Sequence, residues 1–371
     1  MFKFLNLNPE IFGIDINDLS LRLIKLKKRG KGFSLVSFNE VGIKPGLVKE
    51  GAIQDQEALI KVINLACSTV KGEKLDTKYV IVSLPEEKSF SQVIQMPKMA
   101  KEELMTAVPY EAENYIPLTI DKVYLDFQVI STHKDDSSHL DLLVNVMPKP
   151  IVDSYVSTFK RAGLIPCILE VESQAIVRAL VKKGESVFST IFIDFGRTKS
   201  SFIIFSGNSI RFTSSMPISS QQLTSAISDK LGISFDKAEE LKIRHGLNPE
   251  TEKKYDIKKA VNPVLNDLVA QIKKYMSFYQ GHVSHEYFSS GGRIGKIVLC
   301  GGGANLKGLT NFIFEELKIP VELGNPFTNI FLQKNINNQL VPLQKMLSFT
   351  TALGLALRGA DDANLDNYND N

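Results

Sequence analysis

Residues 190–205 read TIFIDFGRTKSSFIIF, a pattern typical of a strand, a tight turn and a second strand. The run Ile191–Phe195 is apolar and β-prone except for Asp194, and Gly196 follows directly. A carboxylate at the end of a buried strand must be solvated, paired or placed on a cation. Glycine and hydroxyl residues in the turn can direct N–H groups and hydroxyls toward an anion. We therefore predict that this hairpin faces a nucleotide phosphate and that Asp194 faces its metal ion. The alternative is a plain hairpin with a solvated aspartate.

A second copy of this pattern lies near the N-terminus. Residues 11–27 read IFGIDINDLSLRLIKLK, with Asp15 between an apolar strand and a polar turn. Residues 297–308 read IVLCGGGANLKG, a buried strand that runs into three glycines before a helix expected from about Leu306. Two strand–Asp–turn–strand units followed by a glycine turn resemble the ATP-binding fold shared by actin, sugar kinases and DnaK-type chaperones. The resemblance implies a two-lobed α/β protein in which the hairpins face each other across a cleft and the glycine turn underlies the adenosine.

Composition limits the classes of partner. The chain has 371 residues, enough for two or three domains, and 43% of them are hydrophobic. Lys and Arg number 44 against 41 Asp and Glu, so the net charge of +3 gives no reason to expect nucleic acid or an anionic membrane. Three distant cysteines, Cys67, Cys167 and Cys300, predict free thiols in a reducing cytoplasm. The sequence shows no signal-peptide core and no run of the roughly 18 apolar residues that a span needs, so membrane association is expected only through a partner.

The order of predicted elements suggests an inserted module. Apolar patterning predicts strands at 12–16, 21–27, 33–41 and 79–84 and a helix at 55–70, which make most of one actin-type half-domain. A β-α-β-β-α module is then expected at 87–166, with strands at 90–96, 123–131 and 140–146 and helices at 101–115, containing Pro109, and 150–162. We assign 1–86, 167–188 and 342–371 to the first domain and 189–341 to the second, with a subdomain at about 235–295. Small residues in helices at 172–183 and 348–357 predict that these two cross at the hinge between the lobes.

An insertion at this point resembles the cell-division protein FtsA and, more closely, the type IV pilus assembly proteins of the PilM family. The likeness to PilM spans roughly residues 12–358 and is carried by VPYEAENYIPLTIDKVYLDFQV (108–129), LGISFDKAEELK (231–242), GGGANLKGL (301–309) and IPVELGNPF (319–327). The alternatives are an FtsA-like division or filament protein, a sugar kinase of the same superfamily, and the cytoplasmic half of a GspL-like secretion protein.

The resemblance implies a site for ATP and Mg²⁺. Asp15 and Asp194 would hold the metal, through water because Mg²⁺ dehydrates reluctantly. Phosphate contacts are expected from both hairpin turns, the sugar is expected over the glycine turn, and one helix flanks the adenosine. The expected residues are Asn17, Asp18 and Ser20; Gly196, Arg197, Thr198, Lys199 and Ser200; Gly301, Gly302, Gly303 and Ala304; and Glu239 and Lys242. Otherwise Arg197 and Lys199 are a solvated hairpin tip, and Glu239 and Lys242 an i,i+3 surface pair.

Two departures from the PilM pattern concern the phosphate contacts. Asn17, Asp18 and Leu19 stand where PilM has glycine and small hydroxyl residues, and Ser219-Ser220 stand where it tends to have glycines. We expect Asn17 to keep the turn in a left-handed conformation and Asp18 to add negative charge near the phosphates, which weakens nucleotide binding. Because no residue is identified as the base that activates water, slow or no hydrolysis is expected.

The resemblance also implies a partner and a location. PilM proteins bind the N-terminal segment of the membrane protein PilN in a groove between the first domain and the inserted module, and we expect the helix at 102–115 and its strands to line that groove. The implied location is the cytoplasm, at the inner face of the cytoplasmic membrane, with other pilus-platform proteins as partners and with self-association. His282 and His285 are expected to be exposed rather than metal ligands, and the polar tail 361–371 is expected to be disordered.

Overall fold

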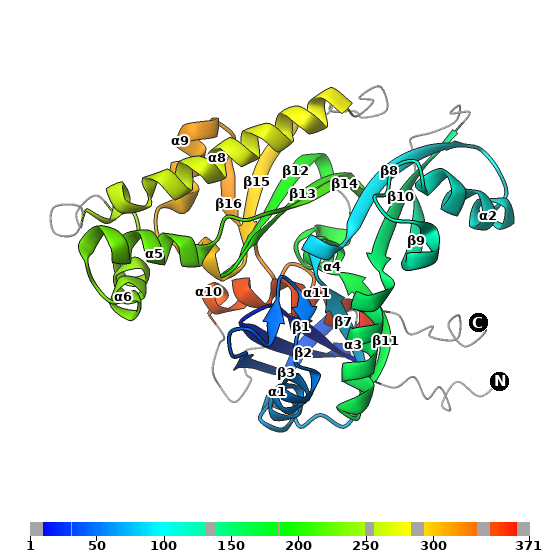
Figure 1. Ribbon diagram of the computed structural model, residues 1–371, viewed down its shortest axis with the longest axis horizontal. Coiled ribbons are helices and arrows are strands. Elements are labelled where there is room, and N and C mark those ends of the chain that lie inside the picture. The colour runs from blue at the N-terminus through cyan, green and yellow to red at the C-terminus, as the bar shows by residue number, and fades with distance from the viewer. Residues whose placement is uncertain are drawn as a thin grey trace.

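The computed structural model describes residues 10–30, 32–130, 139–184, 186–248, 256–282, 293–331 and 342–361. Two lobes, each built on one β-sheet, lie on either side of a pair of helices, and a small third sheet lies beside both lobes (Figure 1). His285 and the tail after residue 361 lie outside the described residues, whereas His282 is the last residue of a long helix. Among the described helices, none is both long and apolar enough to cross a membrane.

The first lobe is built on a six-stranded sheet in the order β11-β7-β1-β2-β3-β6. Its strands are β1 (Phe12–Ile16), β2 (Ser20–Arg29), β3 (Gly32–Gly42), β6 (Lys71–Gly72), β7 (Tyr79–Leu84) and β11 (Ile165–Val171). β1 pairs antiparallel with β2 and parallel with β7. The near-continuous apolarity of β7 suits a strand covered on both faces. One face packs on α1 (Gln56–Ser68) and α3 (Lys149–Arg161), and the other on α11 (Thr350–Asp361).

The helix α3 differs from its expected place in the inserted module. Tyr155 and Phe159 of α3 are fully buried in the same apolar cluster as Leu59 and Ile63 of α1 and Ile14 of β1. By packing, α3 therefore belongs to the first lobe, because its apolar face has the first sheet and not the small sheet as its partner. A short hairpin of β4 (Val48–Lys49) and β5 (Ala52–Ile53) borders this lobe.

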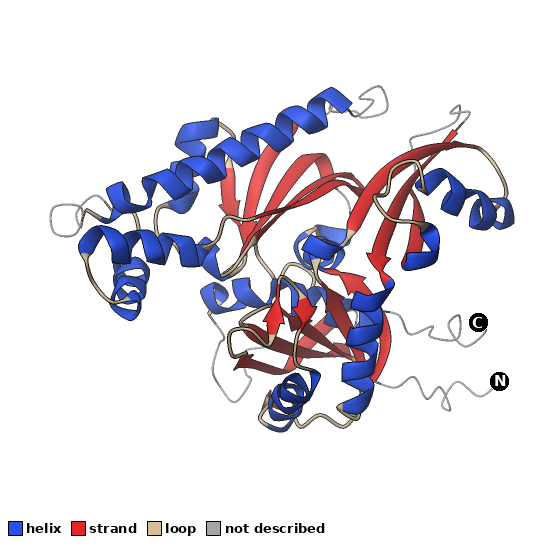
Figure 2. Cartoon of the chain, in the orientation of Figure 1, coloured by secondary structure: helices blue, strands red, loops and turns tan. Residues whose placement is uncertain are grey.

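The second lobe is built on a five-stranded sheet in the order β14-β13-β12-β15-β16. Its strands are β12 (Ser186–Phe195), β13 (Ser200–Gly207), β14 (Ser209–Met216), β15 (Ile294–Cys300) and β16 (Val321–Leu323). The face away from the first lobe is covered by α5 (Ser220–Leu231), α6 (Phe235–His245), α8 (Ile257–His282) and α9 (Leu309–Leu317), with α8 running along the lobe in Figure 2. Ser219 caps α5 and Gly232 ends it in the left-handed conformation, so local sequence sets both ends of this helix.

The inserted module is a three-stranded sheet with one covering helix. Its elements are β8 (Phe90–Pro97), α2 (Lys101–Ala112), β9 (Val123–Ile130) and β10 (His139–Pro148), in the sheet order β8-β10-β9. Leu104, Val108 and Ala112, spaced four apart on α2, pack on one face of this sheet. Residues on the other face, Ile130 and Leu143, join the apolar cluster of the second sheet. The module therefore contacts the second lobe through its own core side chains.

Two helices lie between the large sheets, as the small residues predict. They are α4 (Glu172–Leu180) and α11, and a Cβ on Gly354 of α11 would lie 1.8 Å from the carbonyl oxygen of Ala175 on α4. A Cβ on Gly13 of β1 would lie 2.6 Å from the carbonyl oxygen of Ala352. Backbone thus packs directly on backbone at the centre of the molecule. Short elements complete the chain: η2 (Glu86–Lys88), η3 (Ile120–Lys122), η4 (Lys182–Gly184), η6 (Gly302–Asn305), α10 (Leu343–Met346) and η7 (Leu347–Phe349).

Replacing Gly354 by alanine tests this helix contact. Alanine in a helix interior ordinarily stabilises by about 1 kcal/mol relative to glycine. Here the added methyl group meets the Ala175 backbone, so we expect a loss of about 3 kcal/mol in the free energy of unfolding, measured by urea denaturation. Gly42→Ala is the matched control, because a Cβ there meets no heavy atom within 4 Å. An unchanged urea midpoint for Gly354→Ala would contradict the contact.

Candidate functional site

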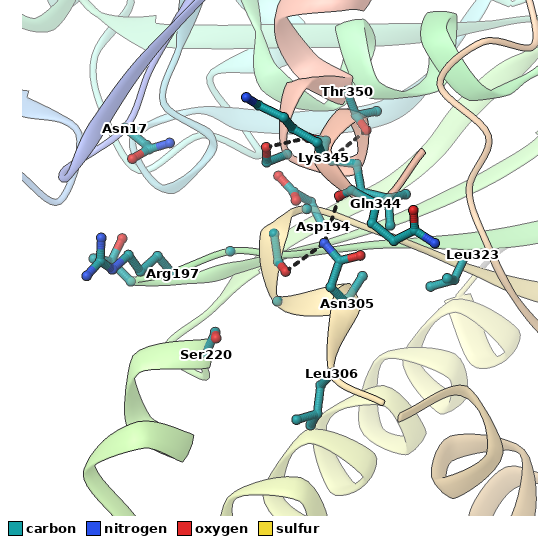
Figure 3. A pocket seen from close by; sticks show the side chains of 18 of the residues that line it. Asn17, Asp194, Arg197, Ser220, Asn305, Leu306, Leu323, Gln344, Lys345 and Thr350 are labelled. Carbon is teal, nitrogen blue, oxygen red and sulfur yellow. Dashed lines mark hydrogen bonds between the residues drawn. The ribbon is translucent and has the colours of Figure 1, made fainter. Parts of the chain in front are cut away.

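The two predicted hairpins meet across one cavity between the lobes. The cavity has a volume of about 980 Å³, within the usual range for a small-molecule site. Figure 3 shows Asn17 on the first lobe, Arg197 and Ser220 on the second, and Asp194 near Asn305 at the glycine turn. Of the sixteen residues expected at the site, thirteen line the cavity: Asp15, Asn17, Asp194, Gly196, Arg197, Thr198, Lys199, Glu239, Lys242, Gly301, Gly302, Gly303 and Ala304.

Asp15 is buried, Asp194 is half-buried, and the charge of Asp15 acts on Asp194. Asp15 is the next-to-last residue of β1 and is 5% exposed; its Oδ1 accepts a hydrogen bond from the Ser83 hydroxyl at 2.9 Å, and its Oδ2 lies 3.9 Å from the Arg22 guanidinium. Burial raises the pKa of Asp15, and Arg22 opposes that shift. Burial, together with the charge of Asp15, raises the pKa of Asp194 to about 7. A divalent cation between them would relieve this repulsion, so the pair fits a metal site.

Glu172 is a fourth carboxylate of the cavity, beside Asp15, Asp194 and Glu239, and it was not predicted from the sequence. It is the first residue of α4, only 4% exposed, and sits where β11 passes into the hinge helix. Burial and the charges of Asp15 and Asp194 raise its pKa well above the ordinary value. Its only signal in the sequence is a glutamate at a strand-to-helix junction, which is too common to single out. Among the described residues, no cluster of three or more His, Cys, Asp or Glu has the geometry of a metal site.

The second hairpin turn is closed by its own backbone and joined to a helix. The Gly196 N–H donates to the Lys199 carbonyl at 3.0 Å, and a Cβ on Gly196 would lie 2.5 Å from that oxygen. The N–H groups of Ser220 and Gln221, at the start of α5, donate to the carbonyls of Gly196 and Arg197, each at 3.0 Å. Ser200 does not line the cavity: its hydroxyl donates to the Ile218 carbonyl at 2.6 Å and is buried. This hydrogen bond attaches the start of β13 to the loop between β14 and α5.

The first hairpin turn is built differently from what we expected. Asn17 does not adopt the left-handed conformation, because it is not among the described non-glycine residues that have a positive φ. Its Oδ1 instead accepts hydrogen bonds from the N–H groups of Leu19 and Ser20 and from the Ser20 hydroxyl. Asp18 accepts from the N–H groups of Glu50 and Gly51 at 3.2 and 3.1 Å. Neither Asp18 nor Ser20 lines the cavity, because both side chains are used in loop contacts. Asp18 therefore lies outside the cavity that we expected it to make more negative.

The glycine turn is required by close approach to the second hairpin. Gly301 has a φ of +81°, and a Cβ there would lie 2.1 Å from Oδ1 of Asp194. A Cβ on Gly303 would meet Phe195 at 2.7 Å, whereas the nearest atom to one on Gly302 is 3.7 Å away. Asn305 fixes the turn by donating to the carbonyls of Gly302 and Gln344 at 3.2 and 2.8 Å (Figure 3). Gly302 is thus the position with open space toward the cavity.

Lys242 lines the cavity, but its ammonium is already satisfied. It donates to the Ser220 carbonyl, the Ser220 hydroxyl and the Thr224 hydroxyl at 2.9, 2.7 and 2.7 Å, and pairs with Glu239 at 2.8 Å. Burial lowers the pKa of Lys242, and the bond to Glu239 opposes that shift. Glu239 is half-buried and also accepts from Thr224. Glu239 and Lys242 are therefore not a pair on the open surface. Lys242 is buried and orients Glu239, whose partly exposed carboxylate lines the cavity.

Comparisons with known proteins bear on the family and the fold. The model of the type IV pilus assembly protein PilM family matches residues 13–360. A chain in a solved PilM–PilN type IV pilus biogenesis complex is 25% identical and superposes with a TM-score of 0.78, covering 95% of this chain and 99% of that chain. MreB5 of Spiroplasma citri bound to ADP has a TM-score of 0.56 at 12% identity, covering 97% of this chain and 98% of that chain, and shares the fold.

Curated relatives include cell-division proteins. FtsA of Enterococcus hirae is 28% identical over 208 residues, which cover 49% of this chain and 46% of that protein. FtsA of Borreliella burgdorferi is 27% identical over 216 residues, which cover 54% and 50%. The chain spans about half the length of the curated relatives it matches. The match to the pilus assembly family, over residues 13–360, therefore spans far more of the chain than either match to FtsA.

Replacing Asp194 by asparagine tests the burial of this carboxylate. Because its folded pKa of about 7 lies above the unfolded value of 3.8, the folded chain binds more protons between these values, and stability falls as pH rises through that window. Asp194→Asn removes this pH-dependent loss of stability. We expect the variant to gain more in Tm over the wild type at pH 8 than at pH 5. Asp229→Asn, at an exposed position of α5, is the control; an equal gain at both pH values would contradict the assignment.

Proposed function

The chain belongs to the family of the type IV pilus assembly protein PilM, and we propose that it is an ATP-binding scaffold that docks the N-terminal segment of a PilN-like membrane protein. The nucleotide part of the proposal rests on one observation: two carboxylates from different lobes line one cavity of about 980 Å³, and the charge of Asp15 helps to raise the pKa of Asp194. Asp15 and Asp194 would hold Mg²⁺ through water, and the turn 196–199 would meet the phosphates. Gly301–Gly303 would lie beneath the sugar, with Glu239 at its hydroxyls.

Slow or absent hydrolysis is part of the proposal. Apart from Asp15 and Asp194, which would hold the metal, Glu172 is the carboxylate lining the cavity whose raised pKa suits it to take a proton from water. Its carboxylate, however, lies 3.2 Å from the Lys199 ammonium and accepts from the Glu86 N–H at 3.4 Å. A carboxylate held in these contacts is poorly placed to orient an attacking water. The site therefore supports binding more than turnover.

A second cavity supports the partner part of the proposal. It has a volume of about 300 Å³ and lies between the first lobe and the inserted module. Its lining includes Tyr124, Leu125 and Asp126 of β9 and Cys167, Leu169 and Glu170 of β11. In the described part of the chain, β9 and β11 are the outermost strands of their sheets. Outermost strands present unpaired N–H and C=O groups, and an extended peptide can pair with them.

We name this cavity, lined by β9 and β11, the edge-strand groove. The helix α2, which we expected to contribute, supplies none of its lining residues, because α2 covers the small sheet through Leu104, Val108 and Ala112. We propose that the PilN-like segment lies extended in the edge-strand groove. Docking there would hold the chain at the inner face of the membrane in which the partner is anchored, where it would meet the other platform proteins.

Titration with a fluorescent ATP analogue in the presence of Mg²⁺ tests the nucleotide site. We expect saturable binding with a Kd on the order of micromolar, which corresponds to about 8 kcal/mol. Asp194→Ala should abolish binding, because it removes one of the two carboxylates that would hold the metal. Asp229→Ala on α5 is the control and should bind as the wild type does. A folded wild-type chain without saturable binding would refute the nucleotide part of the proposal.

Binding of a labelled N-terminal peptide of the PilN-like protein tests the edge-strand groove. We expect Cys167→Arg, which places a long charged side chain on β11 in the groove, to weaken binding at least tenfold, about 1.4 kcal/mol. Met105→Arg is the matched control: Met105 is 61% exposed on α2, outside the groove, and its change should leave the peptide Kd unaltered. The reverse result would place the peptide on α2, and no binding to any variant would contradict docking of this partner.

A further inference from the structure

Lys199 of the second lobe reaches across the cleft to the first lobe. Its ammonium pairs with Glu87 and lies 3.2 Å from Glu172. The side chains of Lys199, Glu87 and Glu172 are 19%, 14% and 6% exposed, so the three charges are largely removed from water. Removing one partner of an ion pair at this depth strongly lowers stability, because the other charge is left buried and unpaired.

Glu87 lies where the inserted module leaves the first lobe. It is the middle residue of η2, the turn between β7 of the first sheet and β8 of the module. The turn is also attached to α4: the Ser173 N–H donates to Oε2 of Glu86 at 3.1 Å. Within the turn, the N–H groups of Lys88 and Ser89 donate to the carbonyls of Pro85 and Glu86, each at 3.1 Å. The position of η2 therefore depends on contacts to both lobes.

The contacts of Lys199 would allow its ammonium to change one anionic partner for another. Lys199 lines the cavity in the hairpin turn whose N–H groups would face phosphate, whereas Glu87 does not line it. The Oε1 atom of Glu87 is buried and has no hydrogen-bond partner among the described residues, so one of the two carboxylate oxygens of this ion pair is left without a hydrogen bond. Burial also lowers the pKa of Lys199 to about 8, which shows that its charged form is poorly solvated. An anion of higher charge in the cavity would compete with Glu87 for the same ammonium.

We propose that Lys199 couples occupancy of the cavity by a nucleotide polyphosphate to the position of the inserted module, by exchanging Glu87 for phosphate oxygens. This inference rests on the proposed nucleotide site. When Lys199 turns to phosphate, Glu87 loses its partner and η2 is released. The strands β9 and β10 belong to the module that η2 joins to the first lobe, and both help line the edge-strand groove. The coupling therefore links the occupancy of the cavity between the lobes to the shape of the edge-strand groove.

Amide hydrogen exchange of the full-length chain, read in peptides that cover residues 86–89, tests the contact itself. Without nucleotide, Lys199→Gln and Glu87→Gln should each speed exchange of this turn at least about fivefold, because both remove the pair that holds it. Lys237→Gln is the matched control, since Lys237 pairs with Glu240 at 2.7 Å on the exposed face of α6. Exchange as slow as in the wild type in both variants would overturn the proposal.

The same measurement with saturating Mg–ATP tests the coupling. In the wild type we expect faster exchange at residues 86–89, and in Glu87→Gln no further change, although this variant still binds the fluorescent nucleotide. Nucleotide binding without a response at 86–89 in the wild type overturns the coupling and leaves the nucleotide site intact. Failure of the wild type to bind the fluorescent nucleotide overturns the nucleotide site and, with it, the coupling.

Discussion

The structure depends on two aspartates that the fold brings together against their mutual repulsion. Asp15 is the next-to-last residue of a strand of one sheet and Asp194 of a strand of the other, and burial raises the pKa of both. Their positions follow from the central helices, because α11 packs backbone to backbone on both β1 and α4. Ser83 and Arg22 compensate Asp15 in part, and the Ser83 hydroxyl also accepts from the Ile16 N–H at 3.1 Å. A residual unfavourable charge is thus built into the cavity between the lobes, where a bound cation would relieve it.

Much of the fold could be predicted from the sequence because its signals are local. Apolar runs bounded by turn residues locate β7, β8 and the two hairpins to within a few residues, and small residues in α4 and α11 indicate their close approach. The place of α3 could not be predicted in this way. An amphipathic helix shows that one of its faces is buried, but its sequence does not say which of two nearby sheets will cover that face.

The site was predictable in its backbone and less so in its side chains. Gly196, Gly301 and Gly303 stand out because no other residue fits their close contacts, and such positions leave a clear trace in the sequence. Asp18, Ser20 and Ser200 share the composition of phosphate-binding turns, yet their hydrogen bonds go to neighbouring loops and strands. The saturated ammonium of Lys242 and the presence of Glu172 both depend on residues distant in the sequence. Side-chain roles of this kind are set by tertiary packing.

The inserted module has a mechanical consequence for the molecule as a whole. It leaves the first lobe at η2 but buries Ile130 and Leu143 against the second sheet, where Asp141 and Arg211 lie 3.6 Å apart in a largely buried pair. If one lobe rotated relative to the other, the module would either have to move with the second lobe or slide along the apolar seam that it forms with the second sheet. Shearing such a seam is costly, since close-packed side chains have discrete rather than continuous arrangements. The module, joined to the first lobe through η2 and packed on the second sheet, would therefore restrict rotation of one lobe relative to the other.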